Sequence, residues 1–515
     1  MRVLVRETIA DAGLALLGEK FDVVVDADSP LEEIVGDYEA LIVRSATKVT
    51  ADVIERGTRL KVIGRAGVGV DNVDVDAATR RGIVVANAPE SNIVSAAEHA
   101  VGLLLALARN IPQAHAALVD GRWERSKWGG VELADKTLGV LGFGRIGRQV
   151  ARRALGLQMK VLAYDPFVSA ERFRELGAES ASFDDVLARS DFVTLHLPLT
   201  DETRGAINAD AIAKMRDGAR LINAARGDLV DDAALVAALK SGKLGGAAID
   251  VFSEEPYSGP LLRAPNVVLT PHLAASTEEA QDRAGVVVAE QVVAALSGGL
   301  VTNAVNIPTV GADDLEVLGP FVPLAAKLGR LALELAGGDV RKIAIEVYGE
   351  LAEYDTRLLT VAALNGAFQG HTDQPVNYVN APVVAADRGI DVVEEKRRSS
   401  RDYTNLVAVS ADGVRVAGTT IGKDARHFLV SALGFDLEME LAPRMALLLY
   451  DDIPGVIGRV GTLFGEAGVN IANMTVSRNR EGGKALMSLS IDAPAPPHLV
   501  EQLRDGMDDA YLIQT

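Results

Sequence analysis

Histidine is scarce in this chain, and one of its seven histidines stands where a proton-transfer group could stand. The stretch "LTPHLAAST" (269–277) places His272 after a proline, at the end of an apolar run that predicts a strand. Imidazole gains and loses a proton readily near neutral pH, so this residue type suits acid and base catalysis. A histidine beside a strand is more often a packing residue, however, and His272 alone does not decide between the two roles.

Two further strand ends carry the charged side chains that such a base would need. The segment "RLINAARGDLV" ends a predicted strand before Arg226, and "GAAIDVFSEEP" ends another before Asp250 and Glu255. Ligands of an open parallel sheet bind outside the carboxyl ends of its strands, so these turns should meet in one crevice. Hydride transfer from a 2-hydroxy acid needs a base, a carboxylate that orients the base, and a guanidinium for the substrate carboxylate. Together the turns favour a catalytic role for His272.

A glycine-rich turn between a predicted strand and a predicted helix provides a candidate cofactor site. In "TLGVLGFGRIGRQVARRAL" (137–155) the pattern G-x-G-x-x-G is formed by Gly142, Gly144 and Gly147. The first glycine permits a tight turn, the second lets a diphosphate approach the backbone, and the third lets helix and strand pack closely. The amides of Arg145 and Ile146 would then face the phosphates at the positive end of the helix.

The next predicted strand indicates which dinucleotide binds. The segment "KVLAYDP" ends in Asp165. A carboxylate at this place accepts hydrogen bonds from the ribose hydroxyls of NAD and repels the 2′-phosphate of NADP. The alternative is an ordinary turn with a solvated aspartate, and the strand, glycine turn and helix around it argue against that. The sequence therefore predicts NAD as the cofactor.

The elements that must position these residues follow from the hydrophobic pattern. From residue 1 to about 300, short β-branched runs alternate with helical segments that end at glycine, which is typical of doubly wound parallel α/β sheets. A long apolar helix is predicted over 96–118, as the crossover from a first small domain into a nucleotide-binding domain whose first strand spans 136–143. A linker is predicted near 300–310.

Composition excludes several classes of protein and site. The chain has 71 acidic and 52 basic side chains, a formal net charge of −19, which disfavours nonspecific binding to nucleic acid or to an anionic membrane. It has no cysteine, which excludes thiol nucleophiles, disulfides and zinc–thiolate sites, and no metal site is predicted. The N-terminal residues show neither a signal-peptide pattern nor an apolar span of membrane length, so a cytoplasmic protein is expected.

The motifs described above, taken in order, resemble those of the D-isomer-specific 2-hydroxyacid dehydrogenases. The resemblance is carried by "LGFGRIGR", "NAARG", "DVFSEEP" and "TPH". It implies that Arg226 binds the carboxylate and keto oxygen of the substrate, that Glu255 partners the histidine, and that His272 is the acid and base. It also implies that Asp250 lies near the nicotinamide carboxamide and that Ala224 contacts the cofactor.

Three earlier segments are similar to the D-3-phosphoglycerate dehydrogenases within that family. These are "LIVRSATKVT" (41–50), "VIGRAGVGVDNVD" (62–74) and "SNIVSAAEHA" (91–100). The resemblance implies NAD-dependent oxidation of 3-phosphoglycerate to 3-phosphohydroxypyruvate, the first step of L-serine biosynthesis. It also implies that the substrate phosphate and carboxylate are bound by Arg44 and Arg65, with Asn92 lining the pocket.

Three alternatives to this function stay open. Arg44 and Arg65 could be solvated charges at strand ends, the substrate could be another D-2-hydroxy acid such as glycerate, or the chain could be a non-catalytic protein that senses NAD. The two arginines argue against an unphosphorylated substrate, because a phosphate needs forked donors where the overall charge of the protein repels it. The complete set of Arg226, Glu255 and His272 argues against a protein without turnover.

The end of the chain resembles the ACT domain, a small regulatory module that binds amino acids. The resemblance is carried by "LLLYDDIPGVIGRVGTLFGEAGVNIANMTVSR" (447–478). Pro454 and Gly455 form the turn before a predicted helix over 456–466, whose free amides suit a ligand carboxylate. A short helix at 497–506 completes a ferredoxin-like βαββαβ unit.

The ACT resemblance implies regulation by the end product of the pathway. L-serine is then the expected effector, bound between paired modules, and the residues that match ligand positions are Tyr450, Asp452 and Asn470. The active form is then expected to be a homo-oligomer, and a tetramer by resemblance. The alternative is a module that serves oligomerisation alone.

Residues 310–440 resemble the intervening domain of the long form of these enzymes. Its basic clusters, 394–405 and 422–430, are interpreted as solvated charge runs, with an anion site as the alternative. The expected architecture is a flavodoxin-like substrate-binding domain, a Rossmann-like NAD-binding domain, an α+β intervening domain and a ferredoxin-like ACT domain. Their predicted ranges are, in that order, 1–97 with 285–304, 98–284, 305–440 and 443–515.

Overall fold

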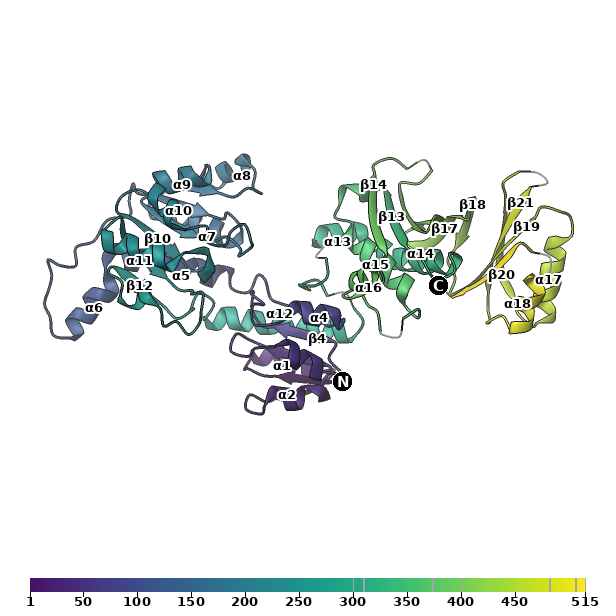
Figure 1. Ribbon diagram of the computed structural model, residues 1–515, viewed down its shortest axis with the longest axis horizontal. Coiled ribbons are helices and arrows are strands. Elements are labelled where there is room, and N and C mark those ends of the chain that lie inside the picture. The colour runs from purple at the N-terminus through teal and green to yellow at the C-terminus, as the bar shows by residue number, and fades with distance from the viewer. Residues whose placement is uncertain are drawn as a thin grey trace.

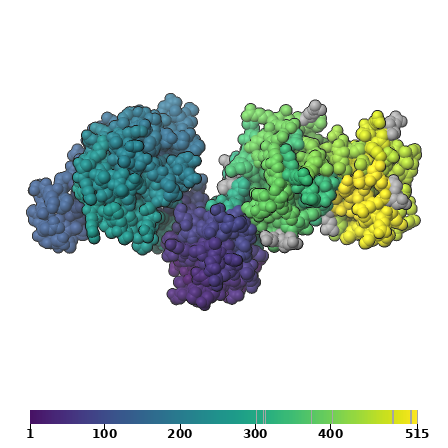
Figure 2. All heavy atoms as spheres, in the orientation of Figure 1, coloured from purple at the N-terminus to yellow at the C-terminus, as the bar shows by residue number. Residues whose placement is uncertain are grey.

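The computed structural model describes residues 1–299, 301–308, 311–372, 375–400, 402–480, 483–504 and 507–514. Within these ranges the paired strands form four sheets, which have five, seven, six and four strands. The first two sheets belong to two lobes joined by a long helix, and the other two follow in the C-terminal half (Figure 1). The four-stranded module lies at the far end of the molecule from the seven-stranded lobe (Figure 2).

The substrate lobe is built on a five-stranded parallel sheet in the order β2-β1-β3-β4-β5, which is the flavodoxin-like order expected from the sequence. Its strands are Arg2–Val5, Asp22–Val25, Ala40–Val43, Val62–Arg65 and Val84–Ala86, for β1 to β5. One face packs against α2 (Leu31–Ile34), α3 (Ala51–Arg56) and α4 (Val75–Arg80). The other face packs against α1 (Asp11–Gly18) and α12 (Glu278–Leu296).

Close packing of α1 against α12 fixes the second of these helices on the substrate lobe. A Cβ on Gly13 would meet the carbonyl oxygen of Gly285 at 2.7 Å, so only glycine permits the approach. Because α12 begins beside the nucleotide lobe and ends on the substrate lobe, it sets the spacing of the two lobes (Figure 1).

The nucleotide lobe contains a seven-stranded parallel sheet in the order β12-β11-β10-β9-β6-β7-β8. Its strands, β6 to β12, are Thr137–Leu141, Lys160–Tyr164, Glu179–Ser180, Phe192–Leu195, Ala219–Asn223, Leu244–Ile249 and Val267–Leu269. The chain leaves β6 toward one edge and returns to β9 on its other side, so the order of strands reverses there, as in Rossmann-like folds. The helices that cover the sheet are α5 (Ile93–Arg109), α7 (Arg145–Gly156), α8 (Ala170–Glu175), α9 (Phe183–Arg189), α10 (Ala209–Lys214) and α11 (Asp232–Ser241).

The single helix predicted over 96–118 is two helices, which corrects the prediction. Helix α5 ends at Arg109, Asn110 adopts a left-handed conformation with φ 54°, and α6 spans Ile111–Val119. Pro112 accounts for the break, because it has no N–H to continue the helix and fits well in a first turn. Helix α6 projects from the nucleotide lobe (Figure 1).

The intervening domain is an α+β unit, as predicted. Its sheet has the order β14-β13-β15-β16-β17-β18 and is antiparallel except between β13 and β14. The strands, β13 to β18, are Lys342–Gly349, Asp391–Arg397, Asn405–Ala411, Val414–Ile421, Arg426–Ala432 and Phe435–Glu440. Its helices are α13 (Ala312–Leu318), α14 (Phe321–Leu335), α15 (Arg357–Phe368) and α16 (Ala381–Asp387), and α14 and α15 contribute many of the buried side chains of the core.

The C-terminal module has the predicted βαββαβ order, with the sheet order β20-β21-β19-β22. Its elements are β19 (Arg444–Asp451), α17 (Val456–Glu466), β20 (Ile471–Arg478), β21 (Lys484–Ile491), α18 (Pro497–Arg504) and β22 (Asp509–Gln514). Residues 505–506, predicted as the end of α18, lie outside the described residues. One face of the sheet packs on its own helices, while Met445, Leu447, Leu486 and Ile513 belong to the core of the intervening domain. The module therefore shares a core with its neighbour.

No helix in the described ranges combines the length and the apolar character that crossing a membrane requires. Groups of three or more His, Asp or Glu side chains placed to hold a metal ion are also absent from those ranges.

Candidate active site

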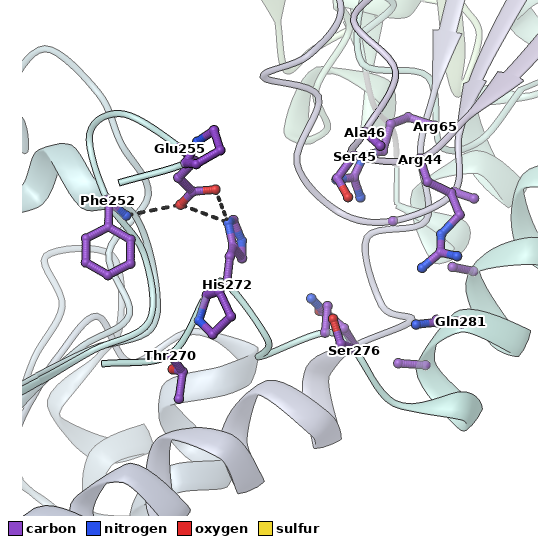
Figure 3. Close-up of a pocket in the computed structure, with 18 of the residues that line it drawn as sticks. Arg44, Ser45, Ala46, Arg65, Phe252, Glu255, Thr270, His272, Ser276 and Gln281 are labelled. Carbon is purple, nitrogen blue, oxygen red and sulfur yellow. Dashed lines mark hydrogen bonds and ion pairs between the residues drawn. The ribbon is translucent and has the colours of Figure 1, made fainter. Parts of the chain in front are cut away.

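A cleft of about 710 Å³ lies between the substrate lobe and the nucleotide lobe. The substrate lobe contributes the loops after β3 and β4 and the residues before α5, while the nucleotide lobe contributes the turns after β11 and β12. The first turns of α12 close one side. Figure 3 shows the charged side chains of the two lobes on opposite sides of this space. The predicted convergence of strand ends is therefore present.

His272 and Glu255 form a hydrogen-bonded pair in the cleft (Figure 3). The Nδ1 atom of His272 lies 2.8 Å from Glu255 Oε2 and 3.1 Å from Oε1. The backbone N–H of Phe252 donates to Oε1 over 3.1 Å and steadies the carboxylate. Because a carboxylate only accepts, Nδ1 carries the proton, which leaves Nε2 as the basic nitrogen. The imidazole is 48 % exposed, so a substrate can reach it.

The backbone of His272 has a left-handed conformation that is uncommon outside glycine. Its φ is 56°, and its N–H donates to the carbonyl oxygen of Asp250 over 2.8 Å. The Asp250 carboxylate accepts from the N–H of Leu273 at 2.8 Å and of Ala274 at 2.9 Å. These bonds tie the turn after β12 to the end of β11, and so fix the direction in which His272 points.

Asp250 itself is fully buried. Burial favours its protonated form, but hydrogen bonds from His99, Thr270 and Leu273 prevail and hold the pKa of Asp250 below its ordinary value. The carboxylate lies under the turn that carries His272 and its two oxygens accept from four groups. The contact of Asp250 with the nicotinamide carboxamide stays a prediction, and the interactions present are those of an anchor for the turn.

Three guanidinium groups lie close enough to influence one another on the substrate side. Arg44 and Arg65 line the cleft, whereas Arg226 is not among its lining residues and lies 3.6 Å from Asp71, beside the loop at Gly69. Burial lowers the pKa of Arg65; Asp71 opposes this, while the positive charges of Arg226 and Arg44 lower the pKa further. An anionic ligand would relieve the repulsion among the three arginines.

The loop that carries Arg44 is organised by a residue that the sequence analysis missed. One Glu7 oxygen accepts from the backbone N–H of Arg44 at 2.9 Å and of Thr47 at 3.0 Å, and the other accepts from Ala46 at 3.3 Å. The guanidinium of Arg44 also donates to the carbonyl of Thr8 over 3.3 Å. A glutamate after a strand has no distinctive pattern, so no sequence signal pointed to it.

Asn92 precedes α5 and lines the cleft, as predicted. Its Oδ1 atom is buried and lacks a hydrogen-bond partner within the ranges described above, so a ligand hydroxyl could supply one. Ser45 and Gln281 also line the cleft near Arg44 and were not predicted (Figure 3). Gln281 lies in the first turn of α12, and only the path of that helix brings it to the substrate lobe.

The glycine-rich turn has the geometry that a dinucleotide needs. Gly142 has a φ of 93°, and a Cβ on Gly147 would meet the carbonyl oxygen of Gly142 at 2.1 Å. A Cβ on Gly144 would meet nothing within 4 Å, so the approach to the backbone is open there. Helix α7 begins at Arg145, so the first amides of the helix, including that of Ile146, point toward this open side. The residues present fit a bound diphosphate.

Asp165, the predicted ribose-binding residue, lies beside the glycine-rich turn. Asp165 follows β7, and its oxygens accept from the N–H of Phe143 at 2.9 Å and of Phe167 at 3.0 Å, which fixes the carboxylate beside the glycine turn. Ala224 follows β10 and packs on the core of the lobe.

His196, after β9, was not singled out from the sequence. Its backbone lies against Gly142, and burial lowers the pKa of His196 to about 4, so it is neutral at pH 7.

Comparisons with known proteins agree with this geometry. Residues 101–274 match the model of the D-isomer specific 2-hydroxyacid dehydrogenase NAD binding domain, 317–430 the D-3-phosphoglycerate dehydrogenase intervening domain, and 445–505 the ACT domain. The chain is 44% identical to the D-3-phosphoglycerate dehydrogenase of Archaeoglobus fulgidus over 100% of both chains. It is 40% identical to that of Bacillus subtilis over 98% of both. The chain belongs to the D-3-phosphoglycerate dehydrogenase family of the D-isomer-specific 2-hydroxyacid dehydrogenases.

Solved structures of other 2-hydroxyacid dehydrogenases resemble the two N-terminal lobes. A D-lactate dehydrogenase from Aquifex aeolicus, complexed with NAD and lactic acid, superposes with a TM-score of 0.53 at 30% identity over 60% of this chain and 100% of that chain. A protein from Thermus thermophilus gives a TM-score of 0.55 at 37% identity over 59% of this chain and 100% of that chain. NAD is the cofactor of this family member, as the sequence predicted.

The three predicted effector residues of the ACT module lie in three different environments. Tyr450 is 3 % exposed and packs in the core of the module. Asp452 lies 3.4 Å from the guanidinium of Arg478. The amide of Asn470 donates to Asp492 Oδ2 over 2.7 Å. The role of these three residues as effector ligands stays a prediction.

Proposed function

We propose that this chain oxidises the C2 hydroxyl of 3-phospho-D-glycerate to 3-phosphohydroxypyruvate with NAD, the first step of L-serine biosynthesis. The observation that carries the proposal is the pairing of His272 with Glu255 across a cleft from Arg44 and Arg65. The relatives named above, which match the whole chain, bear the name of this activity.

The residues of the nucleotide lobe move the proton. Nε2 of His272 takes the proton of the C2 hydroxyl, and Glu255 stabilises the imidazolium that forms by holding its Nδ1 proton. NAD, which the glycine-rich turn and Asp165 would hold, would supply the acceptor for the hydride from C2. Arg226 binds the substrate carboxylate and polarises the oxygen that becomes the keto group.

The residues of the substrate lobe select the phosphate. Arg44 and Arg65 supply forked donors to a dianion in a protein whose net charge of −19 repels anions at long range. Asn92 lines the same cleft, and its Oδ1, which has no hydrogen-bond partner in the part of the chain that the structure describes, suits a substrate hydroxyl. Glycerate would offer no phosphate to these two arginines, and a non-catalytic NAD-sensing protein would not need the Glu255–His272 pair.

The test is formation of NADH, followed by its absorbance, with 3-phosphoglycerate, glycerate and lactate as alternative substrates. We expect kcat/KM to be highest for 3-phosphoglycerate. Equal or higher kcat/KM for glycerate would select the alternative substrate, and no turnover with any hydroxy acid despite NAD binding would select the sensing role.

L-serine as a feedback inhibitor and a homotetrameric assembly belong to the same proposal. The ACT module supports the first, and exposed apolar side chains on and after α6 support self-association, with Ile111 54 %, Leu118 55 % and Trp123 82 % exposed. Serine inhibits only if it binds one arrangement of the modules more tightly, and such coupling is typically about 1–3 kcal/mol. Sedimentation and calorimetry with serine test both points. Calorimetry without serine binding at millimolar concentration would leave the module a scaffold.

The domain ranges and the cytoplasmic location also stay proposals. The ranges 1–97 with 285–304, 98–284, 305–440 and 443–515 follow the four sheets, with the boundary at 285 inside α12. The basic clusters of the intervening domain favour solvated charge runs, because Arg397 pairs with Glu395 and Arg426 pairs with Glu440. Phosphate binding that changes with charge reversal at these arginines would favour an anion site instead.

A further inference from the structure

A second histidine lies beneath the turn that carries His272, and the mechanism above gives it no role. His99 belongs to α5, and its side chain is 23 % exposed. Its Nε2 atom lies 3.1 Å from Asp250 Oδ1 and 3.3 Å from Thr270 Oγ1. The same turn of α5 otherwise buries small and apolar residues against the sheet, such as Ala100 and Leu103, so a packing role would not require an imidazole here.

The direction of the hydrogen bonds around Asp250 follows from chemistry. Thr270 Oγ1 donates to Asp250 Oδ1 over 2.5 Å. A carboxylate only accepts, so Nε2 of His99 carries the proton that it shares with Asp250. Helix α5 thus contributes His99 as a hydrogen-bond donor to the Asp250 carboxylate, which is not exposed to solvent.

That carboxylate holds a strained turn. The backbone of His272 has a φ of 56°, which a side chain other than glycine adopts reluctantly. The two residues that follow, Leu273 and Ala274, donate their N–H groups to the two oxygens of Asp250. Rotation of the Asp250 carboxylate would break one of these bonds, and the Cα–Cβ direction of His272 would no longer be fixed toward Glu255.

We propose that His99 is a positioning residue: its Nε2–H fixes the Asp250 carboxylate, which in turn holds the Leu273 and Ala274 amides and aims His272 at the substrate. This inference rests on the proposed function. It adds a residue from α5 to a site whose proton-transfer groups, Glu255 and His272, follow strand ends. Misplacement of a catalytic group by about 1 Å can cost roughly 100-fold in rate, so the contact has a measurable consequence.

The experiment compares His99→Leu, His99→Gln and His99→Asn with the wild type. The amide nitrogen of Gln is as many bonds from Cα as Nε2 is, whereas that of Asn is one bond shorter and does not reach Asp250. We expect kcat with 3-phosphoglycerate to fall about 10- to 100-fold in the Leu and Asn variants. The Gln variant should stay within about threefold, with KM within about threefold throughout because Arg44 and Arg65 are untouched. His115→Leu, at an exposed histidine of α6, is the matched control and should change neither constant.

Other outcomes overturn the inference. They are a kcat within threefold of wild type for His99→Leu, equal losses in the Leu and Gln variants, or a rise in KM as large as the fall in kcat. If the Leu variant does not fold, the Gln and Asn pair makes the same comparison. If wild type itself forms no NADH, the proposed function fails separately. Hydrogen exchange of the Leu273 and Ala274 amides then decides, and it should accelerate in the Asn variant but not in the Gln variant.

Discussion

The cleft between the lobes and the proposed effector face of the ACT module differ in how their polar groups are used. In the cleft, Arg44 and Arg65 face the Glu255–His272 pair across open space, and each group has capacity left for a ligand. On the ACT module, the side chains of Asp452 and Asn470 are paired with other side chains of the same module. Around them Ile453 and Ile457 are exposed, at 61 % and 52 %.

This difference separates a cleft whose charged groups are brought together by one chain from a surface whose proposed effector site takes residues from a second module. A cleft between two lobes can aim groups from several strand ends at one ligand, because parallel strands share a carboxyl edge. A single small sheet with helices on one side offers no such enclosure. Exposed isoleucines beside paired polar groups suit an interface in which a second module covers the apolar residues.

The largest effect is expected from His272→Ala, which tests whether the cleft is a site for chemistry. Only the proton-transfer step loses its group, so kcat should fall about 10²- to 10⁴-fold while NADH binding, measured by fluorescence, stays near the wild-type value. His115→Ala is the control. Turnover near the wild-type rate would return His272 to a packing role and remove the contrast between the two regions.

The next effect concerns the arginines on the opposite wall. Arg65→Ala should lower kcat/KM for 3-phosphoglycerate by about 10- to 150-fold, since a hydrogen bond to a charged group contributes about 1.5–3 kcal/mol. The loss with glycerate should be smaller, because no phosphate contact is removed. Arg80→Ala, at an exposed arginine of α4, is the control. Equal losses for both substrates would show that Arg65 binds the carboxylate alone or supports the lobe.

The sequence predicted the fold class and the groups of the cleft because both follow from local patterns. Glycine spacing and charged residues at strand ends report directly on parallel sheets, and His272 and Glu255 of the cleft were located in this way. The role of Arg226 toward the substrate stays a prediction. Glu7, Gln281 and His99 were missed, because each acts through a contact between distant segments and none departs from ordinary helix or loop composition.

Two features of the structure had signals that the sequence contained. Tyr450 is in phase with Ala446 and Leu448 along β19, and alternate residues of a strand share a face, so the burial of its side chain under the helices follows from the strand pattern, while its role toward an effector stays a prediction. Pro112 signalled the break after α5, because proline has no N–H with which to continue a helix. The pairing of Asn470 with Asp492, by contrast, depends on the return of the chain after β21 and had no local signal.

A smaller effect is expected at the cofactor ribose. Asp165→Ala removes both an acceptor for the ribose hydroxyls and a charge that repels the 2′-phosphate of NADP, so the preference for NAD should narrow by about tenfold or more. Asp165→Asn keeps one acceptor for the Phe143 N–H and isolates the loss of charge. Equal use of both cofactors by the wild type would contradict the assignment of Asp165.

The smallest effect, and the one that tests the second region, is expected from Asn470→Ala. The NH₂ group of Asn470 donates to Asp492. The Oδ1 atom of Asn470 is then the side that can accept a hydrogen bond from the ammonium group of a serine bound between two modules. The variant should weaken serine binding severalfold in calorimetry and leave kcat unchanged. Asn473→Ala, at an exposed asparagine of β20, is the control. Deleting the module from residue 443 is a poorer test, because Met445 and Leu447 belong to the core of the intervening domain and their loss would expose it. Serine affinity unchanged in Asn470→Ala, with inhibition intact, would mean that the effector binds elsewhere and that the pairing with Asp492 is structural.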